Sequence, residues 1–133
     1  MYLKALQIAF NAHKGQTRRD SDVPYIVHPI RVSSHFDGNT LKAIAVLHDV
    51  IEDTDITFED IKNQFPREIS IPVILLTRYK DEQYSEYIEM ILQDENAIKV
   101  KIADIIDNLS DNPKPSMIPR YIKALDILLN KKT

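Results

Sequence analysis

The sequence predicts an all-α protein, folded as a single orthogonal bundle of about seven helices. Apolar residues recur at helical spacing in one segment after another, the pattern of helices that bury one face. The chain contains only two glycines, and its seven prolines fall mostly at the edges of these segments, where helices begin and end. Its 133 residues match the usual size of one domain, so we expect a single domain over residues 1–133.

The N-terminal part of the chain predicts two helices joined by a charged loop. Residues 2–13 carry an apolar stripe that ends near Gly15, and glycine is suited to capping a helix C-terminus. Residues 16–23 are charged and show no periodicity, so we expect a loop there. Pro24 and the pair His28-Pro29 then open a short turn and a helix that ends near Phe36.

The middle of the chain predicts three more helices. Thr40 is a suitable N-cap for a helix whose apolar residues extend to Ile51, apolar enough to lie in the core. Thr57 and Asp60 have the spacing of a capping box and begin a short helix that stops before Pro66. Residues 67–76 include a strand-like run at 73–76, but the chain offers no partner strand, so a helix is predicted.

The C-terminal part of the chain predicts three amphipathic helices, at residues 82–92, 96–109 and 119–129. The proline-rich segment 111–116 between the last two is expected to be a loop. Tyr84 and Tyr87 stand at helical spacing, which is more typical of core residues than of ligand contacts.

Composition restricts the classes of function. Lys and Arg number 17 against 20 Asp and Glu, and this net charge of −3 disfavours nonspecific binding to nucleic acids or anionic membranes. The absence of cysteine excludes disulfide scaffolds, thiol catalysis and Cys-ligated zinc. The first residues are too quickly polar for a signal peptide, and no apolar run approaches ~18 residues. We therefore expect a cytoplasmic protein that binds neither nucleic acid nor membrane.

Residues 47–54 place ionisable side chains inside a run that is otherwise apolar. On one continuous helix, His48 and Glu52 share a face and Asp49 and Asp53 share the adjacent one. Carboxylates this close repel each other by ~1 kcal/mol per pair in water, and by more when desolvated. A divalent cation would remove this conflict. The alternative is a histidine at a helix end beside a solvated aspartate, and for the dipeptide alone that alternative is favoured.

Two other segments favour a metal site. His28 lies between apolar residues and a helix-starting proline, although a histidine there would by itself be interpreted as structural. Lys101, Asp104 and Asn108 form a polar stripe at i, i+3 and i+7 on an otherwise apolar helix. A solvated helix face is an equally good interpretation of that stripe, but an aspartate surrounded by Ile and Ala favours a cation.

Four segments resemble, in order, the motifs of the metal-dependent HD phosphohydrolase superfamily, and within it the RelA/SpoT-type alarmone hydrolases. They span residues 12–108 and read AHKGQTRR at 12–19, PYIVHP at 24–29, LHDVIEDT at 47–54, and VKIAD at 100–104 followed by Asn108. The resemblance implies an HD-domain-like fold. It also implies hydrolysis of the 3′-pyrophosphate of guanosine tetra- or pentaphosphate, a small-molecule nucleotide.

The resemblance also assigns roles to residues. It implies a divalent metal, usually Mn²⁺ in the family, bound by His28, His48, Asp49 and Asp104. It implies that Glu52 and Asp53 are the catalytic acidic pair, which positions or deprotonates the attacking water and handles the proton of the leaving oxygen. It implies nucleotide contacts from a basic loop and from the polar stripe: Lys14, Arg18, Arg19, Lys101 and Asn108.

Two alternatives remain at this point. Ile105 and Ser110 stand where the family commonly carries basic residues, which favours an HD phosphohydrolase that acts on a different nucleotide. A noncatalytic nucleotide-binding module is the other alternative, and the intact ligand and acidic positions disfavour it. We expect no alarmone synthesis, because no synthetase domain follows.

Overall fold

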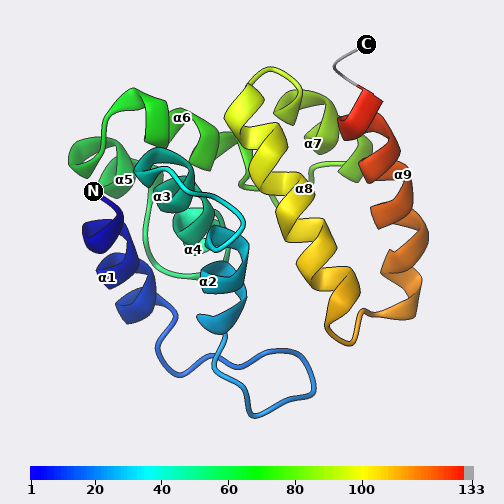
Figure 1. Cartoon of the computed structure of the whole chain (residues 1–133), viewed down its shortest axis with the longest axis horizontal. Coiled ribbons are helices and arrows are strands. Elements are labelled where there is room, and N and C mark those ends of the chain that lie inside the picture. The colour runs from blue at the N-terminus through cyan, green and yellow to red at the C-terminus, as the bar shows by residue number, and fades with distance from the viewer. Residues whose placement is uncertain (131–133) are drawn as a thin grey trace.

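The computed structural model describes residues 1–130, and every regular element in that part of the chain is a helix (Figure 1). The all-α prediction is confirmed. The last three residues of the predicted domain lie outside the described residues. The helices are α1 Tyr2–Ala12, α2 Val27–Ser33, α3 Asn39–Leu47, α4 Val50–Asp53, α5 Phe58–Gln64, α6 Arg67–Leu75, α7 Tyr84–Ile91, α8 Glu95–Ser110 and α9 Ile118–Leu129, with a short 3-10 turn, η1, at Pro115–Met117.

Helix α3 lies at the centre of the fold. Five consecutive residues, Ala43 to Leu47, are fully buried in it, so it contacts neighbours on all sides. Helices α1, α2, α6 and α8 pack against it, and α9 and α7 extend the bundle beyond α8 (Figure 1). This packing brings the C-terminal end of α3, the start of α2 and the middle of α8 to one place.

The segment predicted as one helix from Thr40 to Ile51 is interrupted at His48 and Asp49. In a continuous helix the Ala45 carbonyl would accept from the Asp49 amide, four residues on. Here that carbonyl accepts instead from the backbone amide of His48 at 3.4 Å and from His48 Nδ1 at 2.5 Å. The imidazole therefore ends α3, and the chain restarts as α4. This break is one reason why the described residues form nine α-helices rather than about seven.

Several local predictions are confirmed. Thr57 Oγ1 accepts from the Asp60 amide at 3.1 Å, and Asp60 Oδ2 accepts from the Thr57 amide at 2.9 Å, so the capping box is complete. Residues 67–75 are helical, with Pro72 inside α6. The chain turns after α1 at Gly15, whose φ of +87° is a conformation that glycine adopts readily.

The charged segment after α1 forms a narrow loop rather than an extended excursion. The Arg18 amide donates to the Val23 carbonyl at 2.8 Å, and the Tyr25 amide donates to the Gln16 carbonyl at 2.8 Å. These two bonds close the loop at its base, so Arg18 and Arg19 are held at a defined position. Within residues 1–130, no helix is both long enough and apolar enough to span a membrane.

Candidate metal centre and active-site cleft

Four side chains from three elements converge in the interior. His28 comes from the start of α2, His48 and Asp49 come from the break between α3 and α4, and Asp104 comes from the middle of α8. One nitrogen or carboxylate oxygen of each residue lies within 4.8 Å of those of the other three. Asp104 Oδ1 is 2.8 Å from His28 Nε2 and 3.2 Å from His48 Nε2. A single ion can therefore be reached by all four side chains.

The cluster is buried, and the charges of its members strongly shift one another's pKa values. Both histidines and Asp104 are buried, whereas the side chain of Asp49 is 15% exposed. Burial lowers the pKa of His48, but the charges of Asp49 and Asp104 outweigh it and raise that pKa well above its usual value. Burial raises the pKa of Asp104, but the Lys101 ammonium and His48 outweigh it and hold that pKa well below its usual value. His48 likewise outweighs burial at Asp49 and holds the pKa of that carboxyl below its usual value, so the carboxylates of Asp49 and Asp104 are both available as anions.

The donor set suits a first-row divalent ion. It combines two imidazole nitrogens with two carboxylate oxygens and contains no thiolate, and such sets accommodate Mn²⁺ as well as other ions. Without a cation, two buried carboxylates beside each other would repel. The residues present therefore fit a divalent metal.

Tyr25 supports Asp49, and sequence reasoning missed this role. Its hydroxyl donates to Asp49 Oδ2 at 2.6 Å, which fixes the direction of that carboxylate. Its ring lies between His13 and His28, with centroids 4.9 Å and 5.8 Å away. Tyr25 stands inside one of the four motifs, but a tyrosine before an apolar pair gives no signal of a partner 24 residues away.

Asp107 and Arg31 were also missed. Asp107 Oδ2 is 2.6 Å from His28 Nδ1, and the Arg31 guanidinium bonds both oxygens of the same carboxylate. Burial raises the pKa of Asp107, but its bonds with His28 and Arg31 outweigh it and lower that pKa to about 2. In the sequence, Asp107 between an isoleucine and an asparagine resembles an ordinary solvated residue.

The two predicted polar residues of α8 lie beside the cluster. Lys101 is 8% exposed, and its Nζ donates to Asp104 Oδ2 at 2.9 Å. Asn108 Nδ2 donates to Asp104 Oδ1 at 3.3 Å, and Asn108 Oδ1 accepts from Arg18 at 3.3 Å. The polar stripe on α8 therefore faces the cluster rather than solvent, as the metal-site interpretation required.

Glu52 and Asp53 lie on α4 and line a cavity of about 200 Å³ that opens onto Asp49, His28 and Asp104. The Arg78 amide donates to Glu52 Oε1 at 2.8 Å. Desolvation and the charge of Asp49 raise the pKa of Glu52, although the Arg78 bond opposes the shift. Desolvation and the charges of Asp49 and Glu52 raise the pKa of Asp53 to about 7. Because the helix breaks at His48, the predicted shared face of His48 and Glu52 on one continuous helix is wrong.

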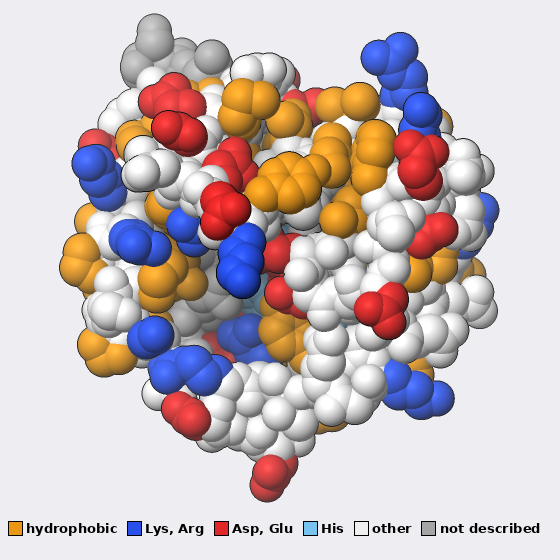
Figure 2. All heavy atoms as spheres, turned by 180° about the vertical axis from the view of Figure 1, so that it is seen from behind, with side chains coloured by type: hydrophobic (Ala, Val, Ile, Leu, Met, Phe, Trp, Pro, Cys, Tyr) orange, Lys and Arg blue, Asp and Glu red, His pale blue; other side chains and the backbone are white. Residues whose placement is uncertain are grey.

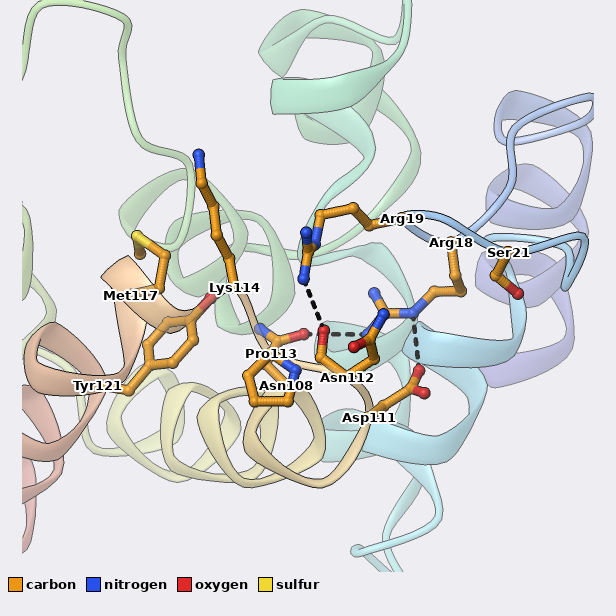
Figure 3. A pocket seen from close by; sticks show the side chains of 10 residues that line it. All are labelled: Arg18, Arg19, Ser21, Asn108, Asp111, Asn112, Pro113, Lys114, Met117 and Tyr121. Atoms are coloured by element: carbon orange, nitrogen blue, oxygen red, sulfur yellow. Dashed lines mark hydrogen bonds and ion pairs between the residues drawn. The ribbon is translucent and has the colours of Figure 1, made fainter.

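A second cavity of about 400 Å³ adjoins the first (Figure 3). The two share Asn108, Met117 and Tyr121 as lining residues. Arg18 and Arg19 reach into the second cavity from the loop after α1, and Lys114 and Tyr121 face them from the other side (Figure 3). Lys14 is exposed and lines neither cavity. The face opposite to that of Figure 1 is hollowed near its centre, and basic and acidic side chains meet around the hollow (Figure 2).

One basic residue that sequence reasoning did not select lines the first cavity, and a second lies against a tyrosine that lines it. Arg78 lines it, and the guanidinium groups of Arg78 and Arg120 lie 5.3 Å and 5.8 Å from the ring centre of Tyr84. Tyr84 and Tyr87 both line the cavity; Tyr84 is half-buried, and Tyr87 is buried and donates to the Leu76 carbonyl at 2.7 Å. Cationic groups are therefore present in both cavities.

Known proteins resemble this chain over most of its length, although no protein-family model matches it. The Drosophila melanogaster guanosine-3′,5′-bis(diphosphate) 3′-pyrophosphohydrolase MESH1 is 37% identical over 125 residues, which are 83% of this chain and 68% of that protein. The Aquifex aeolicus guanosine-3′,5′-bis(diphosphate) 3′-pyrophosphohydrolase is 35% identical over 119 residues, which are 80% of this chain but only 17% of that protein. A solved structure of a metazoan ortholog of SpoT, described as hydrolysing ppGpp, superposes with a TM-score of 0.80 at 27% identity and covers 97% of this chain and 85% of that one.

Proposed function

The chain belongs to the guanosine-3′,5′-bis(diphosphate) 3′-pyrophosphohydrolase family, and from this premise we propose that it hydrolyses the 3′-pyrophosphate of guanosine tetra- or pentaphosphate. Water attacks the phosphorus that is bonded to the ribose 3′-oxygen. The bond between this phosphorus and the 3′-oxygen breaks, and the 3′-oxygen leaves as a hydroxyl. The products are pyrophosphate and GDP or GTP. The observation that carries this proposal is the buried His28, His48, Asp49 and Asp104 cluster at the floor of a cleft with cationic walls.

We propose that these four residues hold one divalent ion, and manganese is the ion that the family resemblance implies. When bound, such an ion acts as a Lewis acid on a phosphoryl oxygen and lowers the pKa of a water molecule. The distances within the cluster and its donor types support this assignment. A cytoplasmic location remains a prediction from the sequence.

Glu52 and Asp53 are our candidates for water and proton handling. Glu52 is tethered by the Arg78 amide, which supports a role in orienting the attacking water. Asp53 has a pKa of about 7, so its carboxyl can take up or release a proton near neutral pH. We assign Asp53 the proton exchange with water or with the leaving oxygen.

Guanosine tetraphosphate carries one diphosphate at the 5′ position and one at the 3′ position of its ribose, and the cleft offers cationic side chains at two places. Arg18, Arg19 and Lys114 line the larger cavity, and Arg78 and Lys101 line the smaller one beside the cluster. Guanidinium groups bind phosphate oxygens in a bidentate manner. We propose that the smaller cavity takes the 3′-diphosphate and that Asn108, shared by both, contacts the sugar or base. Lys14 remains a predicted contact from the sequence.

The test is turnover of guanosine tetraphosphate by the purified, Mn²⁺-loaded protein in water labelled with oxygen-18. The expected products are labelled pyrophosphate and unlabelled GDP, resolved by phosphorus NMR and mass spectrometry. The matched control is Asp104→Asn, which keeps the shape of the side chain and is expected to lose both metal and turnover. A panel of nucleoside monophosphates and 2′- or 3′-phosphorylated cofactors tests the alternative that Ile105 and Ser110 suggest. Turnover of a panel member but not of guanosine tetraphosphate would overturn the proposed substrate.

A further inference from the structure

We propose that Asp107 is a positioning residue for the metal centre: its carboxylate fixes the His28 ring so that Nε2 faces the other three ligands, and Arg31 in turn fixes that carboxylate. This inference rests on the proposed metal site and adds to it two residues outside the ligand set. Its geometry comes from contacts between α2 and α8 whose residues lie 76 or more positions apart in sequence.

The two nitrogens of His28 are engaged by different carboxylates. Nδ1 is 2.6 Å from Asp107 Oδ2, and Nε2 is 2.8 Å from Asp104 Oδ1. An ionised carboxylate only accepts hydrogen bonds, so the contact with Asp107 places a proton on Nδ1. The same rule puts a proton on Nε2 toward Asp104 in the metal-free protein, and because Nδ1 stays bonded to Asp107, it is the Nε2 proton that a bound metal would replace. A carboxylate bonded to the far nitrogen of a ligating histidine also makes that histidine a more basic ligand.

The ring of His48 is fixed in the same orientation, with Nε2 toward the cluster, but by a backbone carbonyl and not by a carboxylate. His48 Nδ1 donates to the backbone carbonyl of Ala45, and its Nε2 faces Asp104 and Asp49. Both rings therefore present Nε2 to one point and have Nδ1 held by an acceptor. His48 obtains its acceptor from the helix that it ends, whereas His28, at the start of α2, requires a side chain from α8.

Asp107 is held too firmly to act as a fifth ligand. Its Oδ1 accepts from Arg31 Nε at 2.8 Å, and its Oδ2 accepts from Arg31 at 3.2 Å in addition to His28. Its side chain is 8% exposed, while that of Arg31 is 41% exposed. Both oxygens are thus already engaged, Oδ1 by Arg31 and Oδ2 by Arg31 and by Nδ1 of His28.

The contacts of Asp107 belong to a closed ring. Arg31 also donates to Asp111 at 2.9 Å, and Asp111 accepts from Arg18 at 3.2 Å. Arg18 bonds Asn108, which bonds Asp104, which returns to His28. A purely structural ion pair between α2 and α8 would need only Arg31 and an aspartate. The additional short contact with His28 is what separates Asp107 from Asp111, and the test exploits that difference.

The experiment measures Mn²⁺ affinity of Asp107→Asn, with Asp111→Asn as the matched control. Both variants remove one negative charge from the same end of α8 and one partner of Arg31, but only Asp107 contacts a histidine. We expect Mn²⁺ affinity, measured by competition with a fluorescent chelator, to fall 10- to 100-fold in Asp107→Asn and to stay within about threefold in Asp111→Asn. Equal losses in the two variants, or no loss in Asp107→Asn, would overturn the proposal.

A second measurement uses the wild-type protein and so does not depend on the variant's folding. In the Zn²⁺-loaded protein, nitrogen-15 NMR of the imidazoles should show a protonated Nδ1 on His28. A protonated Nε2 on that ring would overturn the proposal. If the wild-type protein binds no divalent ion, the proposed function and this inference both fall, whereas normal Mn²⁺ binding without an effect of Asp107→Asn rejects the inference alone.

Discussion

Replacing Lys101 with methionine removes a buried positive charge while keeping the length and most of the volume of the side chain. At 2.9 Å from Asp104 Oδ2, the lost attraction is about 6 kcal/mol with an effective dielectric constant near 20. The variant also avoids the desolvation of the ammonium, so the net effect is smaller. Because breaking one partner of a buried ion pair costs ~3–5 kcal/mol, we expect Lys101→Met to lower the free energy of unfolding of the metal-free protein by about 4 kcal/mol.

A bound divalent ion changes this result, because it supplies the positive charge that Asp104 has lost. We expect the loss in the Mn²⁺-loaded protein to be about 2 kcal/mol. The thermodynamic cycle then requires the same difference in binding, so Mn²⁺ should bind the variant about 30-fold more tightly than wild type. A less stable protein with a stronger metal site is the signature of a lysine that competes with the ion for Asp104.

The measurement is urea unfolding with and without Mn²⁺, followed by far-UV circular dichroism because the chain contains no tryptophan. Mn²⁺ affinity of the folded variant is measured independently by chelator competition. Lys101 Nζ also lies 5.0 Å from the ring centre of Tyr87. Equal stability losses with and without the ion would refute the reasoning, since they would mean that Lys101 acts only through contacts such as this one and not through Asp104. Weaker Mn²⁺ binding in the variant would refute it as well.

Four further outcomes are expected. Thr57→Ala should lower the free energy of unfolding by about 1 kcal/mol, measured in urea, because it removes one half of the capping box while leaving Mn²⁺ affinity unchanged. As the base that takes a proton from the attacking water, Asp53 with its pKa raised to about 7 should make kcat/KM fall as pH drops below about 7, and a pH profile of Asp53→Asn should lack that limb. The effect of pH on stability has the opposite sign. A carboxyl whose pKa is raised by folding makes the protein less stable as pH rises from the pKa of that carboxyl in the unfolded chain toward 7. Asp53→Asn should therefore be more stable than wild type at about pH 8. Arg18→Ala should raise KM for guanosine tetraphosphate by about tenfold or more with little change in kcat, and an unchanged KM would remove Arg18 from the proposed substrate contacts.

Features encoded within a few residues could be predicted from the sequence. The capping box at Thr57 and Asp60 depends on side chains three positions apart, and the loop at residues 16–23 depends on its own lack of periodicity. Proline, glycine and capping residues mark several other helix ends in the same local way, although the N-cap of α3 is Gly38 and not the predicted Thr40. Such signals do not require knowledge of what packs against the segment.

The break between α3 and α4 was not predicted, because the helical spacing of apolar residues continues through it. Val50 and Ile51 fit the stripe of the preceding helix, and only the direction of the His48 ring, back toward the Ala45 carbonyl, ends α3. A histidine side chain that takes a backbone acceptor leaves no trace in periodicity. Whether the helix continues or ends at His48 is decided by the position that its ring occupies in the interior.

Supporting residues were missed because their partners lie far away in sequence. Asp107 obtains its significance from His28 and Arg31, and Tyr25 obtains its significance from Asp49. Asp104 was recognisable because an aspartate surrounded by Ile and Ala on one helix favours a nearby cation. Long-range pairing must be seen in the fold, or inferred from a resemblance that already contains it.

The break at His48 and Asp49 has a consequence for anyone who wishes to build such a centre elsewhere. Neighbouring residues of an uninterrupted helix project about 100° apart around its axis, so a His-Asp dipeptide placed there would direct its two donors away from each other. In this chain His48 Nε2 and Asp49 Oδ2 lie 3.1 Å apart, because the backbone changes course between them. A designer who copied the dipeptide into a long regular helix, or who repaired the interruption to gain helical stability, would lose the chelate. The transferable unit is the interrupted backbone together with its two residues.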